Sequence, residues 1–276
     1  MIPRAAIVIV NFNGGAHLGQ CLRSLVEAPP RTSIEIIVVD NASTDGSQAV
    51  VSDFPSVRLI QLDRNVGFSS GNNTGIRASQ SELVLLLNND TLVPPDAFDR
   101  LVAALDAHPA AAAAGPRLVN GRGDPELSFG PMISPLGELR QKLVTALYAR
   151  SVRPVRSWVE RATRREQYVD WVSGACLLVR RKAAEEVGLL DERFFLYTED
   201  VDFCASLRAK GWNIVFTPSA EIVHLRGRSR STAPRQSNDA YRRSHLAFYE
   251  KHHPRLVPLL RMYLRAKGQL PPTKQP

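Results

Sequence analysis

The stretch Ala5-Ala-Ile-Val-Ile-Val10-Asn11-Phe-Asn13 decides the fold, because six apolar residues, mostly β-branched, lead directly into a polar turn. Such a run is typical of a strand that is buried on both faces, as in a parallel sheet. Leucines at helical spacing follow over residues 16–27. The same alternation predicts further strands and one more helix over residues 34–39, 57–60, 82–87 and 97–105. Strands that alternate with helices of this length predict βαβ units and a mostly parallel sheet, so the expected fold class is α/β.

The chain is less regular after residue 120. Residues 121–168 contain many Gly and Pro residues and one basic segment of helical character over 136–150. Regular patterns then return as a strand, a helix and two short strands over residues 174–179, 201–210, 213–216 and 220–223.

The last part of the chain is basic and amphipathic. One predicted helical face there carries apolar residues at Leu256, Leu259, Leu260, Tyr263 and Leu264. We therefore expect one α/β domain with two halves, followed by a basic helical C-terminal extension. The expected boundaries are residues 1–120, 121–231 and 232–276.

Charge is distributed in blocks. The 35 Lys and Arg residues outnumber the 27 Asp and Glu residues, which gives a net charge of +8. Residues 1–139 carry −5, residues 140–165 carry +7, residues 166–225 carry −4, and residues 226–276 carry +10. Such basic blocks are typical of contacts with nucleic acid, an anionic membrane or a phosphorylated substrate.

Composition excludes several classes of protein. Three dispersed cysteines do not fit a disulfide-stapled mini-domain or a Cys-x-x-Cys metal site. No apolar run approaches the roughly 18–20 residues of a membrane span. We expect a cytoplasmic protein, and the basic segments leave open a peripheral contact with the inner face of the cytoplasmic membrane.

Small polar or charged side chains follow each of the four N-terminal strands. Turn and helix-cap chemistry explains any one of these loops equally well. Ligands in open α/β sheets bind beyond the carboxyl ends of the strands, so four such loops in succession favour a binding site. These residues are Asn11, Asp40, Arg64 and Asn88-Asn89-Asp90.

Several motifs, in this order and spacing, resemble the inverting family 2 glycosyltransferases of the GT-A fold. The first half matches at Val8–Asn13, Val38–Ser47, Asn65–Phe68 with Asn73–Ile76, and Leu85–Asp90. The second half is most similar to the rhamnosyltransferase branch, which builds bacterial cell-surface polysaccharides. It matches at Trp171–Ala175, Gly188–Asp191, Phe194-Phe195, Glu199–Cys204 and His224.

The resemblance implies a Rossmann-like, mostly parallel sheet flanked by helices. Residues 1–120 would bind a nucleotide-sugar donor, linked to dTDP or UDP. Residues 121–231 would bind the acceptor, a saccharide or a polyprenyl-diphosphate-linked saccharide, and would carry the catalytic groups. Donor-binding residues carried over from the family are Asn11, Asp40, Arg64, Gly67, Asn73, Asn88 and Asn89. Gly67 is expected to let the chain approach the nucleotide closely, and Asn73 to brace its loop.

The resemblance also implies a divalent metal, Mn²⁺ or Mg²⁺. The family's Asp-x-Asp motif is Asn88-Asn89-Asp90 here, so Asp90 is the expected metal ligand and one carboxylate is missing. His224 matches a second ligand in related enzymes. An imidazole suits Mn²⁺ better than Mg²⁺.

The acidic cluster of the second half supplies the expected catalytic groups. Asp200 matches the family's base, which takes the proton of the acceptor hydroxyl, and Glu199 would orient it or contact the acceptor. Trp171, Gly174-Ala175 and Asp202 are expected to line the acceptor or donor pocket. The implied reaction moves a hexose, with L-rhamnose from dTDP-rhamnose as the leading donor.

The residues argue against two other functions. A sugar-nucleotide pyrophosphorylase needs a basic residue in the glycine-rich loop after the first strand, and residues 13–17 lack one. A nucleic-acid-binding module would use the basic blocks, but its signatures are absent from the sequence and the strand-end acids would repel phosphate. The basic block of residues 140–165 fits an anionic membrane surface. Arg226, Arg228 and Arg230 could close over the donor diphosphate.

Overall fold

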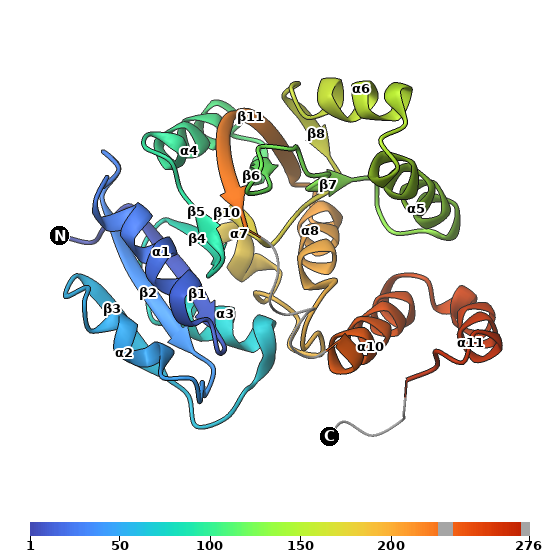
Figure 1. Ribbon diagram of the computed structural model, residues 1–276, viewed down its shortest axis with the longest axis horizontal. Coiled ribbons are helices and arrows are strands. Elements are labelled where there is room, and N and C mark those ends of the chain that lie inside the picture. Colours follow the sequence, from blue (N-terminus) through green and yellow to red (C-terminus); the bar gives the residue numbers. More distant parts are fainter. Residues whose placement is uncertain (226–233, 272–276) are drawn as a thin grey trace.

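The computed structural model describes residues 1–225 and 234–271. Its centre is a nine-stranded mixed sheet with helices on both faces (Figure 1). The order across the main path is β3 (Val57–Gln61), β2 (Ile34–Asp40), β1 (Ala5–Asn11), β4 (Leu83–Asn88), β10 (Cys176–Arg180), β6 (Ala111–Val119), β11 (Asn213–His224) and β5 (Thr91–Leu92). β8 (Gln167–Val169) pairs with β11, and β7 (Phe129–Gly130) pairs with β9 (Trp171–Val172) as a separate ribbon.

Strand direction confirms a mostly parallel α/β sheet with antiparallel insertions. β1, β2, β3 and β4 pair in parallel, and so do β6 and β11. β10 lies between the two parallel groups and runs antiparallel to both β4 and β6. The start of β10 therefore lies at the edge of the sheet where β4 ends.

Each face of the sheet has its own hydrophobic core. Alternate strand residues pack on one face against α1 (Gly15–Val26) and α4 (Ala97–Ala107), with α2 (Ser47–Val51) at the margin. The opposite face is covered by α3 (Gly67–Arg77), α7 (Arg181–Glu186), α8 (Glu199–Ala209), α10 (Pro234–His252) and α11 (Val257–Ala266). α5 (Pro135–Ala149) and α6 (Arg153–Ala162) lie to one side, and a short 3₁₀ turn (Pro254–Leu256) joins α10 to α11.

Two regular elements were not predicted from the sequence. Residues 111–119 form the interior strand β6, although alanine favours helix; β6 lies between β10 and β11, and Ala111–Ala114 are fully buried. The segment after Arg64 is the helix α3 rather than a loop. Its Gly71 and Gly75 pack directly on Val10 and Val8 of β1, and this close packing outweighs the poor helix propensity of glycine.

The C-terminal extension packs on the domain instead of projecting from it. Leu260 and Leu264 of α11 are buried in the second core, as is Phe248 of α10. The predicted apolar face of α11 is divided, because Leu259 and Tyr263 are exposed. Residues 213–224 form one strand with an irregularity between Thr217 and Glu221, where two short strands were predicted. Within the described residues, none of the helices has the length and apolar character needed to cross a bilayer.

Candidate functional site

Polar side chains at the ends of β1 and β2 form a buried hydrogen-bonded cluster. The Asn11 amide nitrogen lies 2.9 Å from Asp40 Oδ1, 3.1 Å from Ser43 Oγ and 2.8 Å from Ser47 Oγ. The second Asp40 oxygen accepts bonds from the Ser43 backbone N–H at 3.0 Å and from Gln48 at 3.2 Å. Both Asn11 and Asp40 are almost completely buried. In the structure they therefore shape the loop after β2 through contacts within the protein.

Asn89 joins this cluster from β4. Its amide nitrogen donates to Asn11 Oδ1 at 2.8 Å. A Cβ at Gly14 would lie 2.0 Å from the same Asn11 oxygen and 2.3 Å from the Asn89 nitrogen, so only glycine fits beside this pair. Gly14 is a site residue that the sequence did not single out.

The three residues around α3 that are expected to bind the nucleotide-sugar donor lie in different environments. Arg64 is exposed and makes no hydrogen bond or ion pair with the described parts of the chain. Gly67 has φ +87°, and a Cβ there would lie 2.5 Å from the Phe195 carbonyl oxygen. The space beside Gly67 is thus filled by Phe195, and this contact alone requires glycine at the position; the expected close approach to a nucleotide stays a prediction.

The Asn73 side chain braces α3 through hydrogen bonds to the second half of the chain. Its side chain donates to the Leu190 carbonyl at 2.8 Å and to Glu192 at 2.9 Å, and accepts from the Leu190 N–H at 3.1 Å. These bonds tie α3 to the Gly188–Asp191 segment of the second half.

The two expected metal ligands lie together at the ends of β4 and β11. His224 Nε2 is 3.3 Å from Asp90 Oδ1 and 3.5 Å from the Asn88 side-chain nitrogen. The other ring nitrogen, Nδ1, lies 3.1 Å from Glu126 Oε2. No cluster of three or more His, Cys, Asp or Glu side chains that could hold a metal occurs in the described residues.

Electrostatics couple these three residues. Burial alone would lower the pKa of His224, but its hydrogen bonds and the charges of Asp90 and Glu126 outweigh burial and raise this pKa to about 9. Burial opposes ionisation of Asp90 as well, and the contact with His224 nevertheless lowers the pKa of Asp90. No motif in the sequence pointed to Glu126, because it lies 98 residues from His224 in an irregular segment.

Asp200 lies in the first turn of α8, half-buried. Its Oδ2 accepts the Gly174 backbone N–H at 2.8 Å, and its Oδ1 accepts the Val201 N–H at 2.8 Å. Burial raises the pKa of Asp200 in spite of these bonds, each of which lowers it. A carboxylate with a raised pKa is a stronger base than one in water.

Glu199 lies beside Asp200 and is buried. Within the described structure, its Oε2 has no hydrogen-bond partner. Burial and the neighbouring charge of Asp200 raise the pKa of Glu199 well above its ordinary value. Glu199 therefore retains its proton more readily than Asp200 does.

The Gly174–Ala175 turn links the two halves of the site. The Gly174 N–H binds Asp200, and the Ala175 carbonyl accepts the Asn88 N–H at 2.9 Å. The catalytic candidate and the Asn88–Asp90 segment thus lie on either side of one dipeptide. Trp171 is buried, packs in the second core and donates its ring N–H to the Pro131 carbonyl at 2.9 Å.

Asp202 does not line a pocket. It is 1% exposed and is held by Lys251 and His252 of α10, at 2.8 and 2.7 Å. The sequence-based expectation that it belongs to the acceptor wall is wrong, because the C-terminal extension covers it. Arg226, Arg228 and Arg230 lie outside the described residues.

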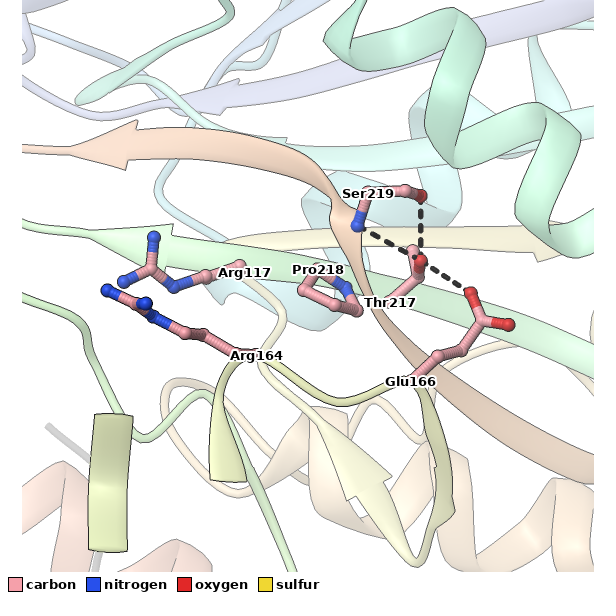
Figure 2. Close-up of a pocket in the computed structure, with 6 residues that line it drawn as sticks. All are labelled: Arg117, Arg164, Glu166, Thr217, Pro218 and Ser219. Carbon is pink, nitrogen blue, oxygen red and sulfur yellow. Dashed lines mark hydrogen bonds between the residues drawn. The ribbon is translucent and has the colours of Figure 1, made fainter. Parts of the chain in front are cut away.

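A separate hollow of about 570 Å³ lies where β11 is irregular (Figure 2). Arg117 and Arg164 point to one side of it, and Thr217 donates to Glu166 at 2.7 Å on the other. Arg117 is also paired with Glu221. None of the expected site residues lines this hollow.

Solved structures with the same architecture define the class. The chain is similar to the mannosyltransferase PcManGT of Pyrobaculum calidifontis, with TM-score 0.61 and 19% identity over 94% of this chain and 68% of that one. It is also similar to GalNAc-T7, with TM-score 0.66 and 14% identity over 99% of this chain and 52% of that one. The fold is that of the GT-A glycosyltransferases.

The sequence comparisons give the family. The glycosyl transferase family 2 model matches residues 6–188. The chain belongs to glycosyl transferase family 2 and is a glycosyltransferase, as the motifs predicted. The nucleic-acid and pyrophosphorylase alternatives are not favoured.

Two curated relatives illustrate the family's chemistry. The N-acetylglucosaminyl-diphospho-decaprenol L-rhamnosyltransferase of Mycobacterium tuberculosis is 33% identical over 260 residues, which cover 90% of this chain and 84% of the relative. The low-salt glycan biosynthesis hexosyltransferase Agl10 of Haloferax volcanii is 28% identical over 232 residues, covering 81% and 68%.

Glu199→Gln is expected to stabilise the protein increasingly as the pH rises. Because the folded-state pKa of Glu199 is raised, wild-type stability falls as the pH rises from the unfolded value through the folded value. Glutamine does not titrate, so the variant does not lose this stability as the pH rises. Thermal unfolding should show a higher Tm for Glu199→Gln than for the wild type, and the difference should be larger at pH 8 than at pH 5.5. Each kcal/mol of stability corresponds to about 2–4 °C in Tm. Glu185→Gln, on an exposed side chain, is the control; a pH-independent difference for Glu199→Gln would contradict the assignment.

Proposed function

We propose that this chain transfers L-rhamnose from dTDP-rhamnose, with inversion, to a polyprenyl-diphosphate-linked saccharide. The observation that carries the proposal is the Gly174–Ala175 turn, which lies between Asp200 and the Asn88–Asp90 segment. A base for the acceptor and a group near the leaving diphosphate must lie on opposite sides of the sugar in an inverting displacement. The named activity of the mycobacterial relative supports the choice of sugar and acceptor.

Asp200 is the proposed base. One bond forms between the acceptor oxygen and the anomeric carbon, while the bond from that carbon to the diphosphate oxygen breaks. The hydroxyl proton passes to Asp200, and the electron pair leaves with the nucleoside diphosphate. The N–H groups of Gly174 and Val201 hold the carboxylate in place during this step. Glu199, which keeps its proton more readily, can donate a hydrogen bond to the acceptor.

The residues at the ends of β4 and β11 fit a divalent metal. Asp90 Oδ1 and His224 Nε2 lie 3.3 Å apart, and Glu126 holds the other ring nitrogen, an arrangement typical of metal-binding histidines. Asp90 and His224 would hold the ion. Both PcManGT and GalNAc-T7 were solved with Mn²⁺. When bound, the metal would neutralise charge on the leaving diphosphate.

The donor nucleotide would lie against the loops after β1, β2 and β3. Asn11 and Asp40 set the shape of the nucleotide surface, and Asn88 and Asn89 border it at β4. Exposed Arg64 could reach the diphosphate as a charged donor. Gly67 and Asn73 would act indirectly, by docking α3 on Phe195 and Leu190.

A donor screen tests the proposal. The purified protein would be incubated with Mn²⁺, a synthetic polyprenyl-diphospho-N-acetylglucosamine and a panel of dTDP- and UDP-sugars. We expect transfer from dTDP-rhamnose in preference to the UDP-hexoses. Transfer of a different sugar would overturn the proposed donor, and no transfer or nucleotide binding with any donor would overturn the reaction.

Asp200→Asn is expected to lower kcat about 10²–10⁴-fold, because the amide cannot accept the proton. Affinity for dTDP, measured by calorimetry, should stay within about twofold, because the proposed nucleotide surface lies on the loops of the first half. A variant that turns over at nearly the wild-type rate would show that Asp200 is not the base.

Asp90→Ala is expected to weaken Mn²⁺-dependent dTDP binding about tenfold or more, because it removes a hard oxygen ligand. Calorimetry with and without Mn²⁺ separates this effect from metal-independent binding. Asn88→Asp, which restores the family's first carboxylate, should act in the opposite direction. An unchanged response of Asp90→Ala to Mn²⁺ would contradict the metal assignment.

The acceptor proposal also suggests where an anionic membrane would make contact. No residue of α5 is buried. Leu136, Leu139 and Leu143 are 78%, 65% and 58% exposed, and Arg140 and Lys142 lie among them. Exposed leucines among basic residues suit an anionic bilayer surface.

Removing two of these leucines tests the membrane contact. We expect wild-type protein to float with vesicles that contain phosphatidylglycerol but not with pure phosphatidylcholine. Leu139→Gln with Leu143→Gln should reduce flotation several-fold, whereas Ile2→Gln, an exposed apolar residue elsewhere, should not. Equal recovery with both vesicle types, or no effect of the double variant, would exclude α5 as the contact.

A further inference from the structure

Helix α10, in the C-terminal extension, makes an ionic contact with α8, the helix that carries Asp200. Lys251 Nζ lies 2.8 Å from Asp202 Oδ2, and His252 Nε2 lies 2.7 Å from Asp202 Oδ1. Lys251 also binds Asp191 at 2.9 Å. Both carboxylate oxygens of Asp202 are therefore held by residues far along the chain. We call Asp202, Lys251 and His252 the α8–α10 clamp.

Further contacts fix α10 against the same region. Ser244 Oγ donates to the Leu196 carbonyl at 2.8 Å, three residues before Glu199. Phe248, between Ser244 and the clamp, is fully buried in the second core. α10 is thus held both to the loop that leads into α8 and to α8 itself (Figure 1).

The clamp acts on the turn that carries Asp200. Asp202 follows Asp200 by two residues, within the first turn of α8. That turn is contacted on its other side by the Gly174 N–H, at 2.8 Å from Asp200. A buried carboxylate without partners is unfavourable, so loss of Lys251 or His252 would shift this turn toward solvent or toward other partners.

We infer that Lys251 and His252 are positioning residues for the transfer reaction: through Asp202 they set the position of the α8 turn and thus of Asp200. This inference rests on the proposed role of Asp200 as base. A displacement of a catalytic group by about 1 Å can lower a rate about 10²-fold. The basic C-terminal extension thereby becomes part of the catalytic apparatus.

The rest of α8 is anchored independently of the clamp. Phe203, Cys204 and Leu207 are buried in the second core. Arg208 pairs with Asp170 at 2.9 Å near the other end of the helix. Variants that lack the clamp are therefore expected to fold, with the first turn of α8 altered.

Kinetics of Lys251→Met and His252→Gln test the inference. We expect kcat to fall about tenfold or more in each variant, while the dTDP affinity and the donor KM change less than about twofold. Lys251→Arg, which keeps the charge, should recover part of the rate. Glu250→Gln is the matched control, because Glu250 lies on the same helix as the clamp residues and loses only its exposed pair with Arg261 of α11. Rates would be compared well below the Tm of each variant.

A double-mutant cycle tests whether both residues act through Asp202. In an Asp202→Asn background, Lys251→Met should lower kcat by less than twofold further, because the shared carboxylate is gone. If Lys251→Met and His252→Gln keep wild-type kcat, or if the full loss persists in the Asp202→Asn background, the inference is wrong.

Hydrogen exchange separates this inference from the proposed function. Amides of residues 199–204 should exchange at least several-fold faster in Lys251→Met than in the wild type or Glu250→Gln. This measurement needs no turnover. If the wild type turns over no donor, the proposed function has failed and exchange alone judges the clamp; unchanged exchange would overturn it.

Discussion

The reversed direction of β10 determines how the two halves of this protein meet. β10 runs antiparallel between β4 and β6, so its first residues lie at the edge where the parallel strands end. The turn before β10 can then bond to Asn88 on one side and to Asp200 on the other. A parallel strand at this position would place the same turn at the opposite edge, away from the ends of β1, β2 and β4.

The acids of this edge differ in the partners that they have. Asp90 is paired with His224, which lowers its pKa. Asp200 has only backbone N–H groups and Glu199 has an oxygen without a partner in the described structure, and burial raises both pKa values. Acids whose pKa values are driven apart can take different roles in one site. Asp90 and His224 are thus kept charged, whereas Asp200 and Glu199 are suited to exchange protons.

The basic residues behind the net charge of +8 have different surroundings. Lys251 of the basic extension pairs with the buried Asp202, which also contacts His252, and His245 and Tyr249 of α10 bind Glu138 of α5, each at 2.8 Å. Part of the C-terminal charge therefore serves packing between helices. The basic residues of α5, Arg140 and Lys142, are exposed beside the leucines, and Lys142 pairs with Glu138 at 3.4 Å.

The sequence by itself determined the α/β class, the polar strand ends and the family, because these depend on local runs of apolar and polar residues. Through the family's motifs it also predicted roles for Asp90, Asp200 and His224, and these roles stay predictions. Only the tertiary structure decided that Glu126 orients His224, that Asp202 faces α10, that residues 111–119 form an interior strand and that Gly67 packs on Phe195. Each of these features depends on contact between residues distant in the chain, and the burial and close packing that such contacts impose outweigh local propensity.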